Sequence, residues 1–242
     1  MRKIYFTLIT IIAVTGTLLL VLNSCKMGCV KGSGKQTSET RKVNEFTRID
    51  ISGAFKINLK QDSSSAVTIT GDDNLLQYIK TDVDDHKLRI KQDKNICSTG
   101  TITVNIGVHH LDLIKASGAV EVFSDGKIVT QDLHLNLSGI TKINMYLDAA
   151  NVNTEASGAT ELMLKGQASS HNVDLSGGGK IQAYDFIVGN YNISTSGASD
   201  CEINVLHDLT VNSSGAASIK YKGNPASIHN DKSGVSTITK VN

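Results

Sequence analysis

The sequence predicts an all-β protein whose strands stack as a parallel, right-handed β-helix, and three observations favour this fold class. Ser-Gly recurs seven times between residues 111 and 239, with glycines 21, 19, 19, 20, 18 and 19 residues apart. A period this constant indicates one structural unit copied in tandem. Polar and apolar residues alternate within each unit, and the chain holds 21 glycines but only one proline. The motifs begin at Ser117, Ser138, Ser157, Ser176, Ser196, Ser214 and Ser233.

Each motif is followed by residues with the alternation of a strand, in which neighbouring side chains point to opposite faces. The fifth residue after the serine is apolar in every unit, and the fourth is polar in every unit. The apolar column contains Val122, Ile143, Leu162, Ile181, Cys201, Ile219 and Ile238. The polar column contains Glu121, Lys142, Glu161, Lys180, Asp200, Ser218 and Thr237.

The Ser-Gly dipeptide itself is expected to form a sharp corner between two short strands. The residue after the glycine is mostly small, and glycine permits the positive φ and close backbone approach that such a corner needs. A unit of about 19 residues cannot bury its apolar face alone, whereas stacked copies share one interior. An all-β sandwich built from hairpins is the alternative, although its units need not keep one period.

Residues 1–24 have the composition of a bacterial lipoprotein signal peptide. Arg2 and Lys3 precede an apolar run that ends at Leu22, and Cys25 follows Ser24. This pattern predicts that Cys25 is acylated and that the lipid bilayer is a partner through its acyl chains. A transmembrane anchor is the alternative, because about 18 apolar residues can span a bilayer. The bulk of the chain is exported in either case.

Residues 25–45 are expected to form a flexible tether, because glycine, serine and basic residues dominate them. Loss of residues 1–24 removes two basic residues, so the formal charge changes from +1 to −1. A domain this close to neutral gives no electrostatic reason to expect nucleic acid as a partner.

Residues 46–242 are predicted to be a single domain, with the array at residues 111–239. Residues 49–59 match the motif pattern, with Ile57 in the apolar column and Lys56 in the polar column. The insert that follows differs: residues 67–70 and 101–108 are predicted strands, and residues 74–77 a turn or a single helical turn. Residues 79–83 and 88–91 are predicted to pair as an antiparallel hairpin near the N-terminal end.

The lipoprotein-like signal, the opening Phe46 to Ala54, the hairpin and the Ser-Gly-Ala array together resemble a known family. The chain is similar to the putative auto-transporter adhesin, head GIN domain family of Bacteroidetes over about residues 46–239. The resemblance implies a β-helical exported domain that acts in adhesion. It identifies no ligand.

Several polar groups are candidate sites, but none is predicted to be catalytic or to bind a metal or cofactor. Asp82, Asp84, Asp85 and His86 offer oxygen-rich ligands that suit Ca²⁺, but a polar hairpin tip explains them equally. His109 and His110 are neighbours expected to face opposite ways. The run 177–179 follows a corner and opens no helix, which argues against a phosphate site. Outward amides could bind glycans or satisfy strand edges; these are Asn136, Asn153, Asn172, Asn192 and Asn212.

The cysteines are predicted to form no structural disulfide, and a bridge between Cys29 and Cys97 is the alternative. Cys29 lies in the expected tether, Cys97 lies in the insert, and Cys201 lies in the buried apolar column, where a thiol behaves as a small hydrophobe.

These observations predict a membrane-anchored, non-catalytic adhesin-like module of the cell envelope, with a glycan, peptidoglycan or protein as its ligand. The anchor predicts an outer-membrane lipoprotein, on either the surface or the periplasmic face. The alternative is a carbohydrate-active enzyme, a polysaccharide lyase or hydrolase, on the same scaffold. Charges that alternate in the polar column avoid repulsion between stacked neighbours, which favours the binding module.

Overall fold

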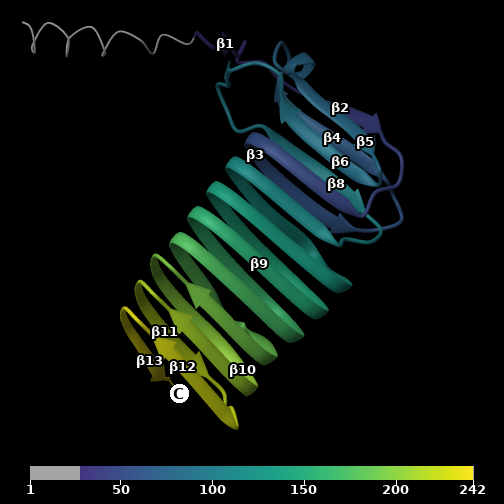
Figure 1. Cartoon of the computed structure of the whole chain (residues 1–242). Helices are drawn as coiled ribbons and strands as arrows, with labels where there is room; N and C mark the ends of the chain where they lie inside the picture. The colour runs from purple at the N-terminus through teal and green to yellow at the C-terminus, as the bar shows by residue number, and fades with distance from the viewer. Residues whose placement is uncertain (1–27, 242) are drawn as a thin grey trace, which may run out of the picture.

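A computed structural model describes residues 28–241, and almost all regular structure in them is β-strand (Figure 1). One short helix, η1 (Leu76–Tyr78), interrupts the strands. The N-terminal strands are β1 (Val30–Lys31), β2 (Gln36–Lys42), β3 (Arg48–Gln61), β4 (Ala66–Asp72), β5 (Ile79–Asp84), β6 (Lys87–Gln92), β7 (Ile96–Cys97) and β8 (Thr103–Val108). The array contains β9 (Leu113–Thr195), β10 (Ala198–Ser213), β11 (Ala216–Lys222), β12 (Ser227–Lys232) and β13 (Val235–Lys240).

The strand pairing corrects the predicted fold class. The all-β class is right. The right-handed parallel β-helix is wrong, because most of the strands join one mixed sheet that contains both antiparallel and parallel pairs. β2 pairs with β4, β4 with β8 and β5 with β6 in antiparallel fashion, whereas β3, β9, β10, β11, β12 and β13 pair in parallel. The physical reason is the insert after β3, whose tight turns reverse the chain and abandon the 19-residue period.

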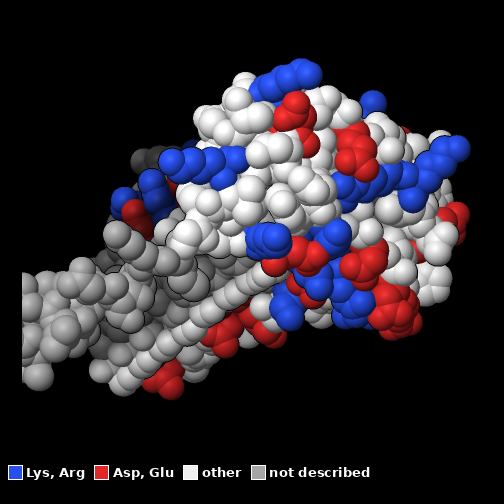
Figure 2. Space-filling view, turned by 90° about the horizontal axis from the view of Figure 1, so that it is seen from above, with Lys and Arg blue, Asp and Glu red and all other residues white. Residues whose placement is uncertain are grey.

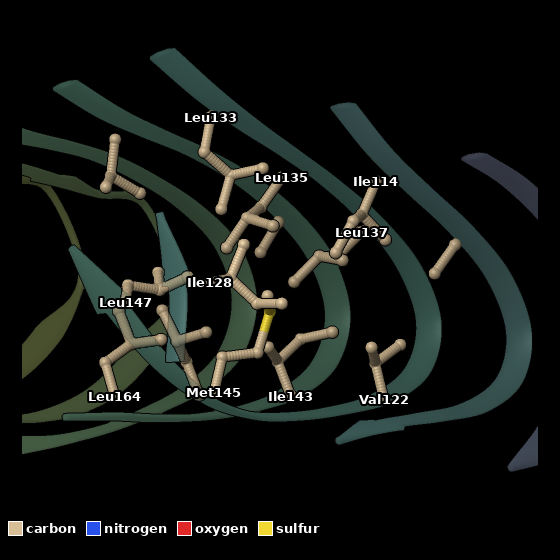
Figure 3. Close-up of a cluster of buried hydrophobic side chains, with 14 of the residues drawn as sticks. Ile114, Val122, Ile128, Leu133, Leu135, Leu137, Ile143, Met145, Leu147 and Leu164 are labelled. Carbon is tan, nitrogen blue, oxygen red and sulfur yellow. The ribbon is translucent and has the colours of Figure 1, made fainter. Parts of the chain in front are cut away.

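The core lies between the bends of β9, which folds back on itself so that successive Ser-Gly motifs lie side by side (Figure 1). The apolar column is buried as expected: Val122, Ile143 and Ile219 are fully buried, and only Ile238, in the last strand, is partly buried. Leucine, isoleucine and methionine side chains from successive passes of β9 point toward one another in Figure 3. Each fully buried side chain of this kind contributes about 1.5–3 kcal/mol to stability.

The corners stack glycine upon glycine, which explains why this residue recurs. Gly158 has φ +95°, and a Cβ added there would lie 2.4 Å from the carbonyl oxygen of Gly139. Gly139 stands in the same relation to Gly118, and Gly177 to Gly158. A side chain at these positions would meet backbone that cannot move aside, so the corner requires glycine on steric and conformational grounds together.

The insert contains the elements predicted for it. β5 and β6 form the antiparallel hairpin, and its turn places Asp85 and His86 at positive φ. The turn expected at residues 74–77 is η1 and the residues before it. Residues 49–59 lie in β3, where Ile57 pairs beside Val122 and Lys56 beside Glu121, so the outlying motif joins the array in register.

Residues 28–45 differ from the flexible tether predicted at 25–45. β2 pairs with β4 along its whole length, from Gln36 beside Asp72 to Lys42 beside Ala66. β1 pairs with β7, which puts Lys31 beside Cys97. Pairing with the insert supplies the backbone partners that a tether lacks.

The prediction of no structural disulfide is wrong, because Cys29 and Cys97 are bonded. Their Cα atoms lie 5.6 Å apart, as the β1–β7 pairing requires. By closing a loop across a sequence separation of 68, the bond stabilises the fold by about 4 kcal/mol in the chain-entropy account.

Buried Asp72 fastens the same region through polar contacts. Its carboxylate accepts hydrogen bonds from the amide and hydroxyl of Thr99, at 2.9 and 2.7 Å, and from the Ser98 hydroxyl at 2.8 Å. The amide of Gly34 and the side chain of Gln36 donate to it as well, each at 3.0 Å. These donors, Thr99 first, lower the pKa of Asp72 to about 2.

Two sequence predictions fall on residues 1–27, outside those that the structure describes. They are the signal peptide at residues 1–24 and the acylation of Cys25. Within residues 28–241 no helix is long and apolar enough to cross a bilayer.

Candidate binding surfaces beside the Ser-Gly corner

A polar strip lies on the strand before the corner. We define it as the row two residues ahead of each serine from Ser138 to Ser233, together with the exposed serines that follow. In β10 the register sets Asn212 between Ser194 and Asp231, and the amide of Asn136 donates to Glu155 at 3.5 Å. Two adjoining hollows of about 470 and 330 Å³ share Asp174 and Ser196. The row consists of Asn136, Glu155, Asp174, Ser194, Asn212 and Asp231.

The strip offers free hydrogen-bonding groups, as a binding surface must. Asp174 and Asn212 are exposed, and within residues 28–241 their side chains make no hydrogen bond or ion pair with another residue. Carboxylates accept hydrogen bonds and carboxamides both donate and accept them. The strip is therefore chemically suited to a ligand rich in hydroxyl groups.

A groove lies on the other side of the corner, and we call the outward row along it the charge row. In spatial order this row consists of Lys56, Glu121, Lys142, Glu161, Lys180 and Asp200. The groove floor is made of small residues, among them Ala119, Ala159 and Ala198. Its two stretches, of about 850 and 470 Å³, share Ala119 and Glu121. Five of the seven residues of the polar column read from the sequence, together with Lys56, thus form one continuous edge of a groove.

Contacts along the charge row are few. The Lys142 ammonium lies 3.2 Å from the Glu161 carboxylate, and Lys56 lies 5.0 Å from the centroid of the Phe123 ring. Figure 2, a view onto the N-terminal end, shows that basic and acidic side chains intermingle there and that neither sign gathers alone. Alternation within the row is consistent with the expected avoidance of like neighbours.

A polar group in the core of the array was missed by the sequence reasoning. His171 Nε2 lies 2.9 Å from the Thr154 hydroxyl, and His171 Nδ1 lies 2.8 Å from the Tyr191 hydroxyl. Burial lowers the pKa of His171 to about 3 and raises the pKa of Tyr191 well above its usual value. The imidazole is therefore neutral and satisfies both hydroxyls, so this group stabilises the fold.

The aspartates of the β5–β6 hairpin, which were candidate ligands for a cation, form ion pairs with arginines instead. Asp82 and Asp84 lie 3.5 and 3.0 Å from the Arg89 guanidinium, and Asp85 lies 3.0 Å from Arg48. Arg48 lowers the pKa of Asp85, and the hydrogen bond that Arg89 donates to Asp84 raises the pKa of Arg89. Among residues 28–241 no three His, Cys, Asp or Glu side chains are arranged to hold a metal ion.

His109 and His110 lie just beyond the end of β8, with ring centroids 4.4 Å apart. The expectation that they face opposite ways is wrong, because the strand alternation on which it rested ends at Val108.

The other weighed groups serve the sheet. Asn172 donates to Asn153 at 2.9 Å, so these two amides pair with each other, whereas Asn192 and Asn212 are exposed. The glycine run at 177–179 lies inside β9 at a corner. Cys201 is buried and free, as predicted, and burial raises the pKa of its thiol to about 12.

Polarity at a fixed offset from each serine was the available signal for the polar strip. Two of its members, Asn136 and Asn212, are among the outward amides named from the sequence, but the acidic and hydroxyl residues that complete the row were not connected with them. Asp72, in contrast, has no signal in the sequence, because its donors come from two loops distant in the chain.

The fold and these surfaces define a class: an all-β protein whose stacked strands display long rows of like-placed side chains. The chain belongs to the putative auto-transporter adhesin, head GIN domain family, which it matches over residues 45–225. The family resemblance read from the sequence is thereby confirmed. A comparison with curated proteins finds no match.

Solved structures of bacterial proteins share this fold. A putative adhesin from Bacteroides fragilis is 25% identical with a TM-score of 0.84, and the match covers 88% of this chain and all of that one. A putative adhesin from Parabacteroides distasonis is 23% identical (TM-score 0.72, coverage 88% and 100%). A putative lipid binding protein from the same species is 16% identical (TM-score 0.71, coverage 89% and 100%). The last two likenesses speak for the fold alone.

Proposed function

We propose that this chain is an exported, non-catalytic adhesin that binds a hydroxyl-rich glycan along the polar strip. The observation that carries the proposal is the strip itself: carboxylates, amides and hydroxyls repeat across neighbouring strands, and Asp174 and Asn212 have no partner among the described residues. Because the strands fix the spacing of these groups, little ordering is needed when a ligand binds. The adhesin names of the family and of its solved relatives agree with this role.

Export is supported by the Cys29–Cys97 disulfide, since such bonds form and persist in oxidising compartments and are rare in the cytosol. We place the protein in the cell envelope, anchored to the outer membrane through an acylated Cys25. The anchor is tested by metabolic labelling with a palmitate analogue: Cys25→Ala should abolish the label. Persistence of the label would refute acylation at this residue.

Glycan binding is tested with a glycan array, paired with an assay for released reducing sugar. Binding without sugar release supports the adhesin, and release would favour the lyase or hydrolase alternative. Asp174→Ala with Asn212→Ala should remove most of the binding signal on the glycan array, because it deletes two free hydrogen-bonding groups of the strip. Both side chains face solvent and neither supports the core, so the fold should be unaffected. The matched control is Asn190→Ala, an exposed asparagine outside the strip. Loss of signal in the control variant, or its survival in the double variant, would contradict the assignment.

A further inference from the structure

The charge row has a symmetry that its role within one chain does not require. Lys56 pairs beside Glu121, and Lys180 beside Asp200, so the register is fixed at both ends. Six charged residues follow one another without a break in alternation, and a hydroxyl residue stands at either end: Thr103 beside Lys56, and Ser218 beside Asp200. The spatial order is Thr103, Lys56, Glu121, Lys142, Glu161, Lys180, Asp200 and Ser218.

An even number of alternating charges is complementary to its own reverse. A row that reads positive to negative from one end reads negative to positive from the other. If a second copy lies face to face with its long axis reversed, Lys56 meets Asp200, Glu121 meets Lys180, and Lys142 meets Glu161. A parallel copy in register would instead set each charge against itself.

The groove floor follows the same reversal. Ile140 is 70% exposed, which is unusual for a side chain of this size, and it lies in the layer of Lys142. Reversal places it opposite Ala159, in the layer of Glu161, where the small side chain leaves room. Ala119 meets Gly178 in the same way. Ile140 is the one large apolar side chain that is exposed among the described residues lining the groove, and it is thus matched to a small one. Burying both would exclude water from the charge pairs.

We propose that the charge row and the groove floor form an interface with a second copy of this chain. A two-fold axis passes between the layers of Lys142 and Glu161, and the long axes of the two copies are antiparallel. A second copy is the fitting occupant because it repeats the same strand spacing of about 4.8 Å, so all six charges stay in register. Each contact then occurs twice, as in any isologous interface. The interface lies across the corner from the polar strip and does not depend on the proposed glycan binding.

The test is a charge reversal between residues that cannot meet within one chain. Glu121 and Lys180 lie three layers apart, or about 14 Å, but the two-fold axis pairs them across the interface. Residues 28–241 contain the whole sheet, its core and its disulfide, so this span is produced for sedimentation equilibrium over a concentration series. The parent should form dimers. Lys180→Glu and Glu121→Lys alone should each raise the dimer Kd at least about tenfold, because each sets like charges face to face.

The double variant decides the matter. Glu121→Lys with Lys180→Glu restores opposite charges across the axis, and its Kd should return to within about threefold of the parent value. Within one chain, however, the double change places like charges on neighbouring strands. If the single changes acted only by destabilising the monomer, the double change would therefore be more harmful than either of them. The control is Asp174→Lys, in the polar strip, which should leave the Kd unchanged. A monomeric parent, a dimer indifferent to Lys180→Glu, or a double variant without recovery would each overturn the proposal.

Discussion

The N-terminal region, residues 28–110, and the array, residues 111–239, are stabilised by different means. In the N-terminal region antiparallel strands, a disulfide and the buried carboxylate of Asp72 join segments that lie far apart in the sequence. In the array parallel strands stack like residues upon like, with an apolar column inside and glycines at each corner. Six of the nine ion pairs among the described residues lie in the N-terminal region.

The difference teaches how a periodic structure can be ended. Stacked strands leave an open edge at each end, and such an edge invites pairing with other chains. At the N-terminal end β8 continues the sheet parallel to β3, and β4 and β2 follow as antiparallel strands. The Cys29–Cys97 disulfide and the hydrogen bonds to Asp72 then fasten the segments around them. Periodic packing suffices inside the array, whereas specific contacts secure its margin.

The largest expected effect tests the apolar column. Ile181→Asp places a carboxylate at a position that is 1% exposed, which should cost more than about 4 kcal/mol of unfolding free energy. The exposed neighbour provides the control: Lys180→Asp should change the stability of the monomer, measured below the dimer Kd, by less than about 1 kcal/mol. Chemical denaturation of both variants makes the measurement. Equal losses would contradict the alternation on which the array rests.

Removal of the disulfide is expected to act on the N-terminal region. Cys29→Ser with Cys97→Ser should lower stability by about 4 kcal/mol through the greater entropy of the unfolded chain. Hydrogen exchange followed by mass spectrometry should show faster exchange in β1, β2 and β7 and little change in β10. If exchange rises equally throughout, the two regions do not differ as described.

A pair of glycines separates steric contact from backbone conformation. Gly158 and Gly126 have nearly the same φ, +95° and +90°, but a Cβ at Gly126 would meet nothing within 4 Å. Gly126→Ala should cost about 1 kcal/mol, and Gly158→Ala about 3 kcal/mol, because its Cβ also meets the Gly139 carbonyl. Thermal denaturation compares the two variants. Similar losses would mean that glycine stacking adds nothing to the corner.

The smallest effect concerns pH. Because the pKa of His171 falls from 6.5 to about 3 on folding, its contribution is fully present above pH 6.5 and is lost as the pH falls toward 3. Stability should therefore drop by about 2 kcal/mol between pH 7 and pH 5 on account of this group. His171→Gln should remove that slope, and His207→Gln, at an exposed histidine, should preserve it. Denaturant titrations at each pH make the comparison, and a slope that persists in His171→Gln would show another group to be responsible.

Much of the array could be read from the sequence, because its determinants are local and repeated. The alternation of Glu121 with Val122, or of Lys180 with Ile181, fixes which face is buried without knowledge of the partner strand. The corners could be located because each glycine follows a serine at a regular spacing and precedes a residue that is mostly small. The hairpin of β5 and β6 was equally legible, since its turn and both strands are contiguous.

The sequence predicted the all-β class correctly, but it did not predict the mixed pairing of the sheet. The period indicated parallel stacking and the insert indicated an antiparallel hairpin, but neither pattern says how the two join into one mixed sheet. The antiparallel pairing of β2 with β4 joins segments that begin 30 residues apart, and no periodicity links them.

By itself, then, the sequence determined the all-β class, the buried column, the glycine corners and the polar character of both outward rows, since each depends on spacing along one chain. Only the tertiary structure decided that Cys29 meets Cys97, that Asp72 gathers donors from two loops, and that His171 lies between Thr154 and Tyr191. The first two join residues whose separation in the sequence carries no pattern, and the third depends on side-chain orientations inside the core that the repeat spacing does not specify. Their free energy is available only after the strands have set the register.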